Sequence, residues 1–97
     1  MDTNPIGRLV ISRAGRDKGR PFLIVGIWDE NHVLLADGAL RTMLRPKKKK
    51  LRHLKVTGVS SEAIRVQLEK GAKPLDADIR KELCSLGLPG QEPEQEG

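Results

Sequence analysis

The stretch LRPKKKKLRHLK, Leu44 to Lys55, has the residue types and spacing to hold phosphate groups. Residues 41–55 contain no Asp or Glu, so the positive charges there repel one another, and a polyanion relieves that cost. The cations are Arg41, Arg45, Lys47, Lys48, Lys49, Lys50, Arg52 and Lys55. His53 lies among them, either as a structural or merely exposed residue or as a further contact to a phosphate or a base. A short lysine run alone is more typical of a solvated surface, so its meaning depends on the rest of the chain.

A second basic stretch, RAGRDKGR, spans residues 13–20 and has the glycines of a turn. Its cations are Arg13, Arg16, Lys18 and Arg20. Such a turn is either a charged surface loop or a loop that presents guanidinium and backbone N–H groups to phosphates. Asp17 lies inside the cluster, and we expect it to pair with Arg13, Arg16 or Arg20.

The charge of the 97-residue chain is divided along its length. Residues 1–55 hold 13 Lys and Arg against 5 Asp and Glu, whereas residues 56–97 hold 5 against 8, within a net charge of +5. This asymmetry predicts a polyanionic partner for the first half. The length corresponds to one domain with a modest core.

No pattern in the sequence supports catalysis, a metal or a cofactor. Two histidines and one cysteine do not make a recognisable zinc site, and GRDKG (15–19) lacks the length and the Lys-Ser/Thr ending of a P-loop. The single cysteine, Cys84, excludes an internal disulfide, and we expect it to be at least half-buried. Without a signal-peptide pattern or an apolar run of ~18 residues, we expect a cytoplasmic protein that binds neither membrane nor small-molecule substrate.

Short β-branched runs separated by turn residues predict a β-rich first half. The expected strands are residues 7–12, 20–28, 33–36, 40–44 and 51–56, with Asp37-Gly38 as a hairpin signal. Pro46 removes a backbone donor, so the lysines after it should start on a loop or an edge strand. In an extended segment, Lys47 and Lys49 point one way and Lys48 and Lys50 the other.

The strand at residues 20–28 is apolar on both faces, so another element must cover the second face. Simple alternation assigns Phe22, Ile24 and Trp28 to one face, and Leu23, Val25 and Ile27 to the other. Phe22 and Trp28 are the only aromatic residues, and we expect both in the core. For a nucleic-acid partner, that expectation argues against base-by-base recognition and for recognition of backbone and shape.

The C-terminal half predicts helices that cover this strand. Residues 60–71 combine the apolar alternation of a strand with helix-end signals, and we favour a helix with Ser60 as N-cap. Residues 75–87 predict a second amphipathic helix with Asp76 as N-cap. The acidic Pro/Gly-rich residues 89–97 predict a disordered tail.

The stretch GRLVISRAGRDKG resembles the KOW motif, a strand–turn–strand unit of ribosomal proteins and transcription-elongation factors. The resemblance rests on Gly7, Val10, Gly15, Lys18-Gly19 and the apolar strand that follows. It extends through GIWDENHVLLADGALR and RPKKKKLRHL, which are similar to a small bacterial KOW-domain RNA-binding family related to a large-subunit ribosomal protein family of archaea and eukaryotes. The similarity covers about residues 6–54.

The resemblance implies a small SH3-like barrel, in agreement with the closely spaced strands and glycine-rich turns. We therefore expect a five-stranded KOW/SH3-like barrel over residues 6–58, and the helical patterns predict an extension over residues 59–88. The resemblance also implies binding to ribosomal RNA of the large subunit, with Gly15 letting the backbone approach RNA and with Gly19 as a further RNA-binding residue. Large-subunit ribosomal proteins are expected as further partners. In this interpretation the two basic stretches form two walls of one surface. Two alternatives remain: a protein-interaction module built on an SH3-like barrel, and a double-stranded DNA-binding accessory protein.

Overall fold

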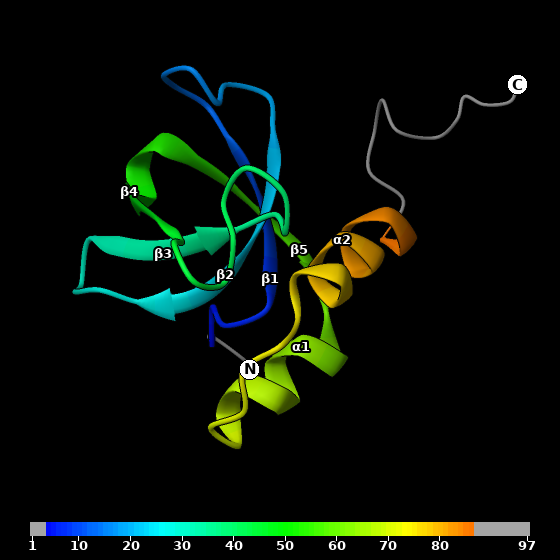
Figure 1. Ribbon diagram of the computed structural model, residues 1–97. Coiled ribbons are helices and arrows are strands. Elements are labelled where there is room, and N and C mark those ends of the chain that lie inside the picture. The colour runs from blue at the N-terminus through cyan, green and yellow to red at the C-terminus, as the bar shows by residue number, and fades with distance from the viewer. Residues whose placement is uncertain (1–3, 87–97) are drawn as a thin grey trace, which may run out of the picture.

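A five-stranded antiparallel sheet followed by two helices makes up residues 4–86, the part of the chain that the computed structural model describes (Figure 1). The elements are β1 (Arg8–Ser12), β2 (Pro21–Ile27), β3 (His32–Ala36), β4 (Lys47–Lys50), the 3₁₀ helix η1 (Leu51–His53), β5 (Leu54–Ser60), α1 (Glu62–Glu69) and α2 (Asp76–Ser85). The order in the sheet is β4-β3-β2-β1-β5, so β4 and β5 are its edges. The predicted mainly β fold with C-terminal helices is confirmed, and the open sheet is compatible with a small KOW/SH3-like barrel.

One face of the sheet encloses a first apolar cluster, here called the inner cluster. It consists of Val10, Phe22, Ile24, Val33, Leu35 and Leu54. Strands β1, β2 and β3 and the first residue of β5 all contribute, so the curved sheet itself buries these side chains. Phe22 is 1% exposed, which confirms its predicted place in the core.

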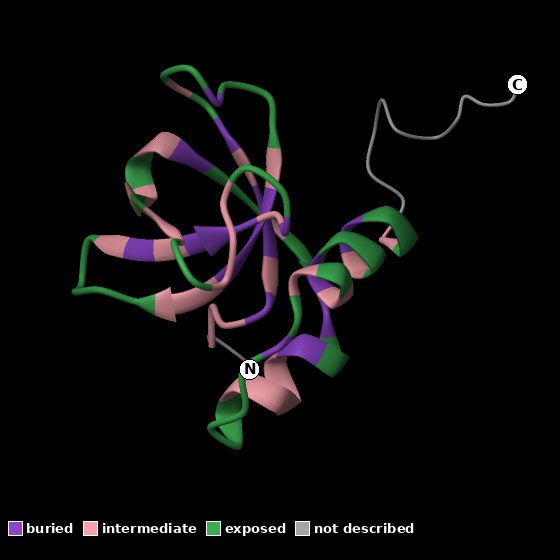
Figure 2. Cartoon of the chain, in the orientation of Figure 1, coloured by how far each residue is buried: buried purple, intermediate pink, exposed green. Residues whose placement is uncertain are grey.

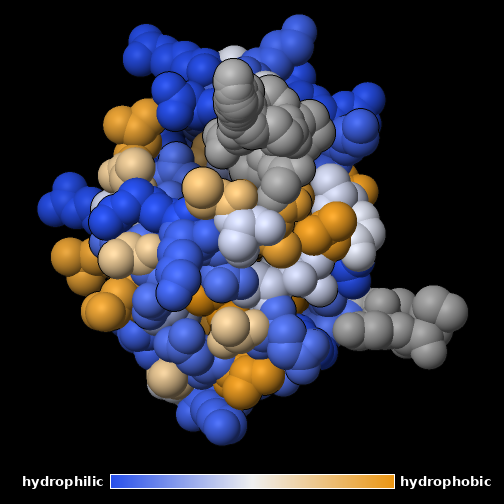
Figure 3. All heavy atoms as spheres, turned by 90° about the vertical axis from the view of Figure 1, so that its right-hand side faces the viewer, coloured by the Kyte–Doolittle hydropathy of each residue, from blue (hydrophilic) through white to orange (hydrophobic). Residues whose placement is uncertain are grey.

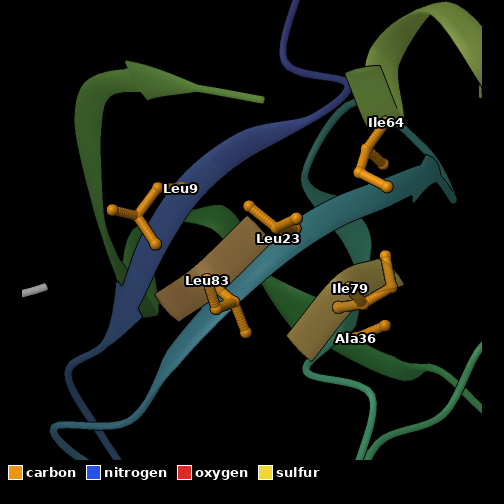
Figure 4. Packing of buried hydrophobic residues seen from close by; sticks show 6 residues of the cluster. All are labelled: Leu9, Leu23, Ala36, Ile64, Ile79 and Leu83. Carbon is orange, nitrogen blue, oxygen red and sulfur yellow. The ribbon is translucent and has the colours of Figure 1, made fainter. Parts of the chain in front are cut away.

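The opposite face of the sheet carries the outer cluster, which the helices cover. It consists of Leu9, Leu23, Ala36, Ile64, Ile79 and Leu83 (Figure 4). Ile64 comes from α1, whereas Ile79 and Leu83 lie one helical turn apart on α2 and face the strand residues. The prediction that C-terminal helices cover the second face of β2 is therefore confirmed.

The strand predicted at residues 40–44 is wrong, because that backbone bonds elsewhere. The N–H groups of Asp37 and Gly38 donate to the Arg41 carbonyl oxygen, at 2.8 and 3.0 Å, and so close a turn. The Asp76 carboxylate accepts from the Met43 N–H at 2.7 Å. The turn also packs closely against the start of α2, because a Cβ on Gly38 would clash with the Asp76 carbonyl oxygen. Strand pairing with β3 resumes only after Pro46.

The last strand is shifted relative to its prediction at residues 51–56. Leu51 to His53 form η1, whose first N–H donates to the Asn31 carbonyl oxygen at 2.8 Å. This turn carries the chain from one sheet edge, β4, to the other edge, β5. β5 continues past the predicted end at residue 56, through Gly58 to Ser60.

Both helices form, with caps one residue from the predicted positions. Ser61 is the N-cap of α1, where its hydroxyl oxygen accepts from the Ile64 N–H at 3.2 Å, because Ser60 still pairs with β1. Leu75 is the N-cap of α2, and Asp76 is its first residue. The strand alternative for α1 is wrong.

Three further expectations concern the C-terminal half of the chain. Cys84 is exposed, so its predicted burial is wrong. The tail, residues 89–97, lies outside the described residues. Within residues 4–86, neither helix is long and apolar enough to span a membrane.

Candidate nucleic-acid interface

Loop 13–20 joins β1 to β2 and presents exposed cations on a well-bonded backbone. Its four basic residues are all exposed, as are Gly15 and Gly19. The β1–β2 loop is accordingly mostly green in Figure 2. Both glycines have positive φ values, +78° and +87°, which other residues rarely adopt. The Gly19 N–H donates to the Ser12 carbonyl oxygen at 2.8 Å and closes the loop. Four cations therefore stand on one short, hydrogen-bonded loop.

Asp17 fixes this loop to the segment that follows β3. Its carboxylate accepts a hydrogen bond from Arg41 Nη2 at 3.1 Å, and the Asp17 side chain is only 9% exposed. The expected pairing with Arg13, Arg16 or Arg20 is wrong. Since Arg41 neutralises this largely buried carboxylate, the four loop cations stay available to solvent.

Two further contacts hold loop 13–20 against segment 41–55. Lys49 Nζ donates to the Ala14 carbonyl oxygen at 3.1 Å, and the Arg13 N–H donates to the His53 carbonyl oxygen at 2.8 Å. The two basic stretches, distant in sequence, thus lie side by side. Strongly hydrophilic side chains gather along the top of Figure 3, the end of the molecule where this loop lies in Figure 1.

Strand β4 divides the lysine run between two faces. Lys47 and Lys49 are half-buried, whereas Lys48 and Lys50 are exposed. The pairing with β3 explains this pattern: Lys49 is opposite Val33, on the inner-cluster side, and Lys48 is opposite Leu34, on the outer side. The alternation predicted for an extended lysine segment is therefore confirmed.

The remaining predicted residues of segment 41–55 differ in exposure. Arg45, Arg52 and Lys55 are exposed, and His53 is half-buried. Arg52 and His53 belong to η1, and Lys55 lies on β5 opposite Ile11. Segment 41–55 therefore wraps from one edge of the sheet to the other and spreads its charge over more than one face.

Trp28 is 58% exposed, so the expectation that it belongs to the core is wrong. A β-bulge explains the error. Ile24 pairs with Leu35 but Gly26 pairs with Leu34, so β2 uses one residue more than β3 at this point. Beyond the bulge the faces exchange, and Trp28 lies on the outer side.

The exposed indole has a cation over its ring. Lys48 Nζ lies 4.7 Å from the ring centroid, within the range of a cation–π interaction. Sequence reasoning missed this pair. The glycine at position 26, inside an otherwise apolar strand, was the available signal of a bulge.

The turn after Trp28 is organised by Asp29. Its Oδ1 atom accepts from the N–H groups of Asn31 and His32, each at 2.8 Å, and lies 2.9 Å from His32 Nδ1. The hydrogen bond with His32, followed by that with the Asn31 backbone, holds the pKa of the Asp29 carboxyl below its ordinary value.

Fold and surface together define a small basic β protein with a helical cover on one side of its sheet. No protein-family model matches the chain. It is 32% identical over 88 residues to large ribosomal subunit protein eL14 of Desulfurococcus amylolyticus, covering 91% of this chain and 84% of that protein. The proteins of the same name from Aeropyrum pernix and Pyrobaculum calidifontis are 31% and 29% identical over 83 residues, covering 86% of this chain and 76% and 74% of theirs.

The chain therefore belongs to the family of large ribosomal subunit protein eL14. This result supports the expected relationship to a large-subunit ribosomal protein family. These relatives come from archaea, so they give no support to the bacterial part.

Proposed function

We propose that this protein binds structured RNA, namely ribosomal RNA of the large subunit, as a non-catalytic cytoplasmic component of translation. Its relatives are named as proteins of that subunit. The observation that carries the proposal is the joining of loop 13–20 to segment 41–55 by three contacts, from Asp17, Ala14 and Arg13. Neighbouring large-subunit proteins are proposed as its further partners.

In the proposed mechanism the basic residues have two kinds of role. The exposed cations contact phosphates: Arg13, Arg16, Lys18, Arg20, Arg45, Lys48, Lys50, Arg52 and Lys55. Arg41 and Lys49 hold the surface together through Asp17 and Ala14, so their effect on RNA is mainly indirect. Lys47 and His53, both half-buried, line the surface and add charge or shape.

The glycines of loop 13–20 support the same mechanism. A Cβ on Gly19 would meet no atom within 4 Å, so the space beside it is open to a partner. A Cβ on Gly15 would have only Lys49 Nζ nearby, at 3.5 Å. An RNA backbone can approach both positions closely, and the loop N–H groups and guanidinium groups then act on the same phosphates.

The test compares charge reversal on two sides of the molecule. Arg16→Glu with Lys18→Glu should weaken binding to large-subunit ribosomal RNA and reduce its salt dependence. The wild-type slope of log affinity against log salt should be about −0.7 to −0.9 per phosphate contact. Lys70→Glu with Lys73→Glu is the control, because these exposed lysines carry the same charge change but follow α1, distant from the loop (Figure 1).

Equal losses from both pairs of substitutions, or a salt-independent affinity, would contradict the proposed surface. A double-stranded DNA of equal length serves as competitor. Full competition by DNA at physiological salt would favour the DNA-binding alternative, because phosphate attraction is common to both nucleic acids. A peptide-binding module needs an exposed aromatic groove, and Trp28 is exposed, but the Lys48 ammonium over its ring favours a polyanion.

A further inference from the structure

We propose that Trp28 is a stacking platform for an unpaired base of the RNA that the basic surface binds. This inference rests on the proposed function and adds to it a contact with a base. It applies to the hairpin end, defined here as residues 28–31 between β2 and β3. Figure 1 shows that this turn lies away from the helices.

The strand register places two lysines on the same side of the sheet as the Trp28 indole. His32 pairs with Lys50 and Leu34 pairs with Lys48, so both exposed lysines share the outer side with Trp28. The Trp28 backbone N–H donates to the His32 carbonyl oxygen at 3.0 Å, and this bond holds the Trp28 backbone against the start of β3. Lys48 covers part of the ring, and the remaining indole surface is open to solvent.

A hollow lies between the start of β3 and the segment formed by the end of β4 and η1. Its volume, about 460 Å³, is within the ~300–1,000 Å³ that is usual for small-molecule sites. It is lined by Asn31, His32, Lys50, Leu51 and Arg52. The hydrogen bond from the Leu51 N–H to the Asn31 carbonyl oxygen, at 2.8 Å, holds its two walls together. Lys50 and Arg52 can pair with the phosphate of a nucleotide whose base lies on Trp28.

The two acidic residues of the hairpin end leave this surface usable by an anion. Asp29 directs Oδ1 to the N–H groups of Asn31 and His32 and to the His32 ring, so its charge is largely compensated. Glu30 is exposed at the turn and is a single negative charge against the cations of β4 and η1. The positive side chains outnumber it.

An unpaired base fits this combination better than the edge of a duplex. Every base has a flat face that stacks on an aromatic ring, whereas a duplex hides those faces within its own stack. The cation–π pair and the lysines add attraction for the attached phosphates. Strand β4 is an edge of the sheet: its Lys49 holds loop 13–20 on the inner side, and Lys48 and Lys50 lie on the outer side, so one RNA that passes around this edge can contact both sides.

Trp28 is the only tryptophan of the chain, so its fluorescence reports on this site alone. The full-length protein is titrated with single-stranded oligoadenylate of about eight nucleotides and, separately, with a blunt RNA duplex. Stacking should quench the fluorescence with the single strand, and the duplex should produce little quenching even while it binds. Affinities for both are measured by the anisotropy of labelled RNA.

Trp28→Ala should weaken binding of the single strand by about 5- to 150-fold, the range found when a stacking aromatic is removed. Binding of the duplex should change little. Trp28→Tyr, which keeps an aromatic ring, should retain most of the affinity. Leu75→Ala is the control, because it removes another large side chain that is exposed, at the start of α2.

The variants separate failure of this inference from failure of the proposed function. Wild-type affinity for the single strand in Trp28→Ala, with binding lost in Arg16→Glu/Lys18→Glu, would overturn the stacking platform and leave the basic surface intact. An unquenched indole in the bound complex would overturn it as well. Loss in neither set of variants would overturn both.

Discussion

Phe22 and Trp28 are the only aromatic residues of the chain and belong to the same sequence run, yet their surroundings are opposite. Phe22, near the start of β2, is 1% exposed within the inner cluster. Trp28, directly after β2, is 58% exposed with Lys48 over its ring. The bulge between them exchanges the two faces of the strand. One added residue in a strand can thus separate an aromatic that stabilises the fold from one that is available to a partner.

The largest expected effect tests that difference directly. Phe22→Ala should lower the free energy of unfolding by about 3–5 kcal/mol, because it leaves a cavity in the inner cluster. Trp28→Ala should lower it by less than about 1 kcal/mol, since it removes a half-exposed ring and one cation–π contact. Urea unfolding followed by circular dichroism measures both. Similar losses for the two variants would show that the indole is part of the core.

A smaller loss of stability is expected from breaking the ion pair between Arg41 and Asp17, which holds the loop that leads into β2. Arg41→Ala leaves the largely buried Asp17 carboxylate without its ion pair, and should cost about 1–3 kcal/mol. Arg16→Ala is the control, since Arg16 is exposed and should change stability by less than about 0.5 kcal/mol. Thermal and urea unfolding measure both. If Arg41→Ala is as stable as Arg16→Ala, the ion pair does not hold the loop.

Much of the fold follows from local patterns. β-branched runs between glycine-rich turns marked the first three strands, and serine, acidic residues and glycine marked the helix ends. The error at residues 40–44 has a tertiary cause, because Asp76, more than thirty positions away in the sequence, takes the Met43 N–H. A lysine run has little strand propensity of its own, and β4 forms because β3 offers an open edge.

The candidate site was predictable in composition but not in geometry. Acid-free segment 41–55 and the turn at residues 13–20 are visible as charge patterns. The bonds from Arg41 to Asp17 and from Lys49 to Ala14 join residues 24 and 35 positions apart, and local patterns carry no information on such pairs. Trp28 was assigned to the core because alternation assumes an unbroken strand, whereas the glycine at position 26 accompanies a bulge.

The smallest expected effect lies in the turn at the Trp28 end. The Asp29 pKa is held below its ordinary value, first by the hydrogen bond with His32. His32 Nδ1 lies 2.9 Å from Asp29 Oδ1, and His32→Leu removes this hydrogen bond. His32→Leu should therefore raise the Asp29 pKa toward its ordinary value without fully restoring it, because the Asn31 N–H still donates. The carboxyl-carbon chemical shift, followed by NMR against pH, measures this change.

The sign of the accompanying stability change follows from the lowered pKa of Asp29. A carboxyl whose folded pKa is depressed stabilises the fold above its unfolded pKa, and that contribution is lost as pH falls through the folded pKa. His32→Leu should remove part of this dependence at acidic pH, while His53→Leu, which changes the other histidine, should leave the Asp29 titration as it is. An Asp29 pKa that does not move in His32→Leu would assign the shift to the backbone N–H groups alone. The turn beside Trp28 would then be ordered by its own backbone, and His32 would be free to contact a ligand in the adjacent hollow.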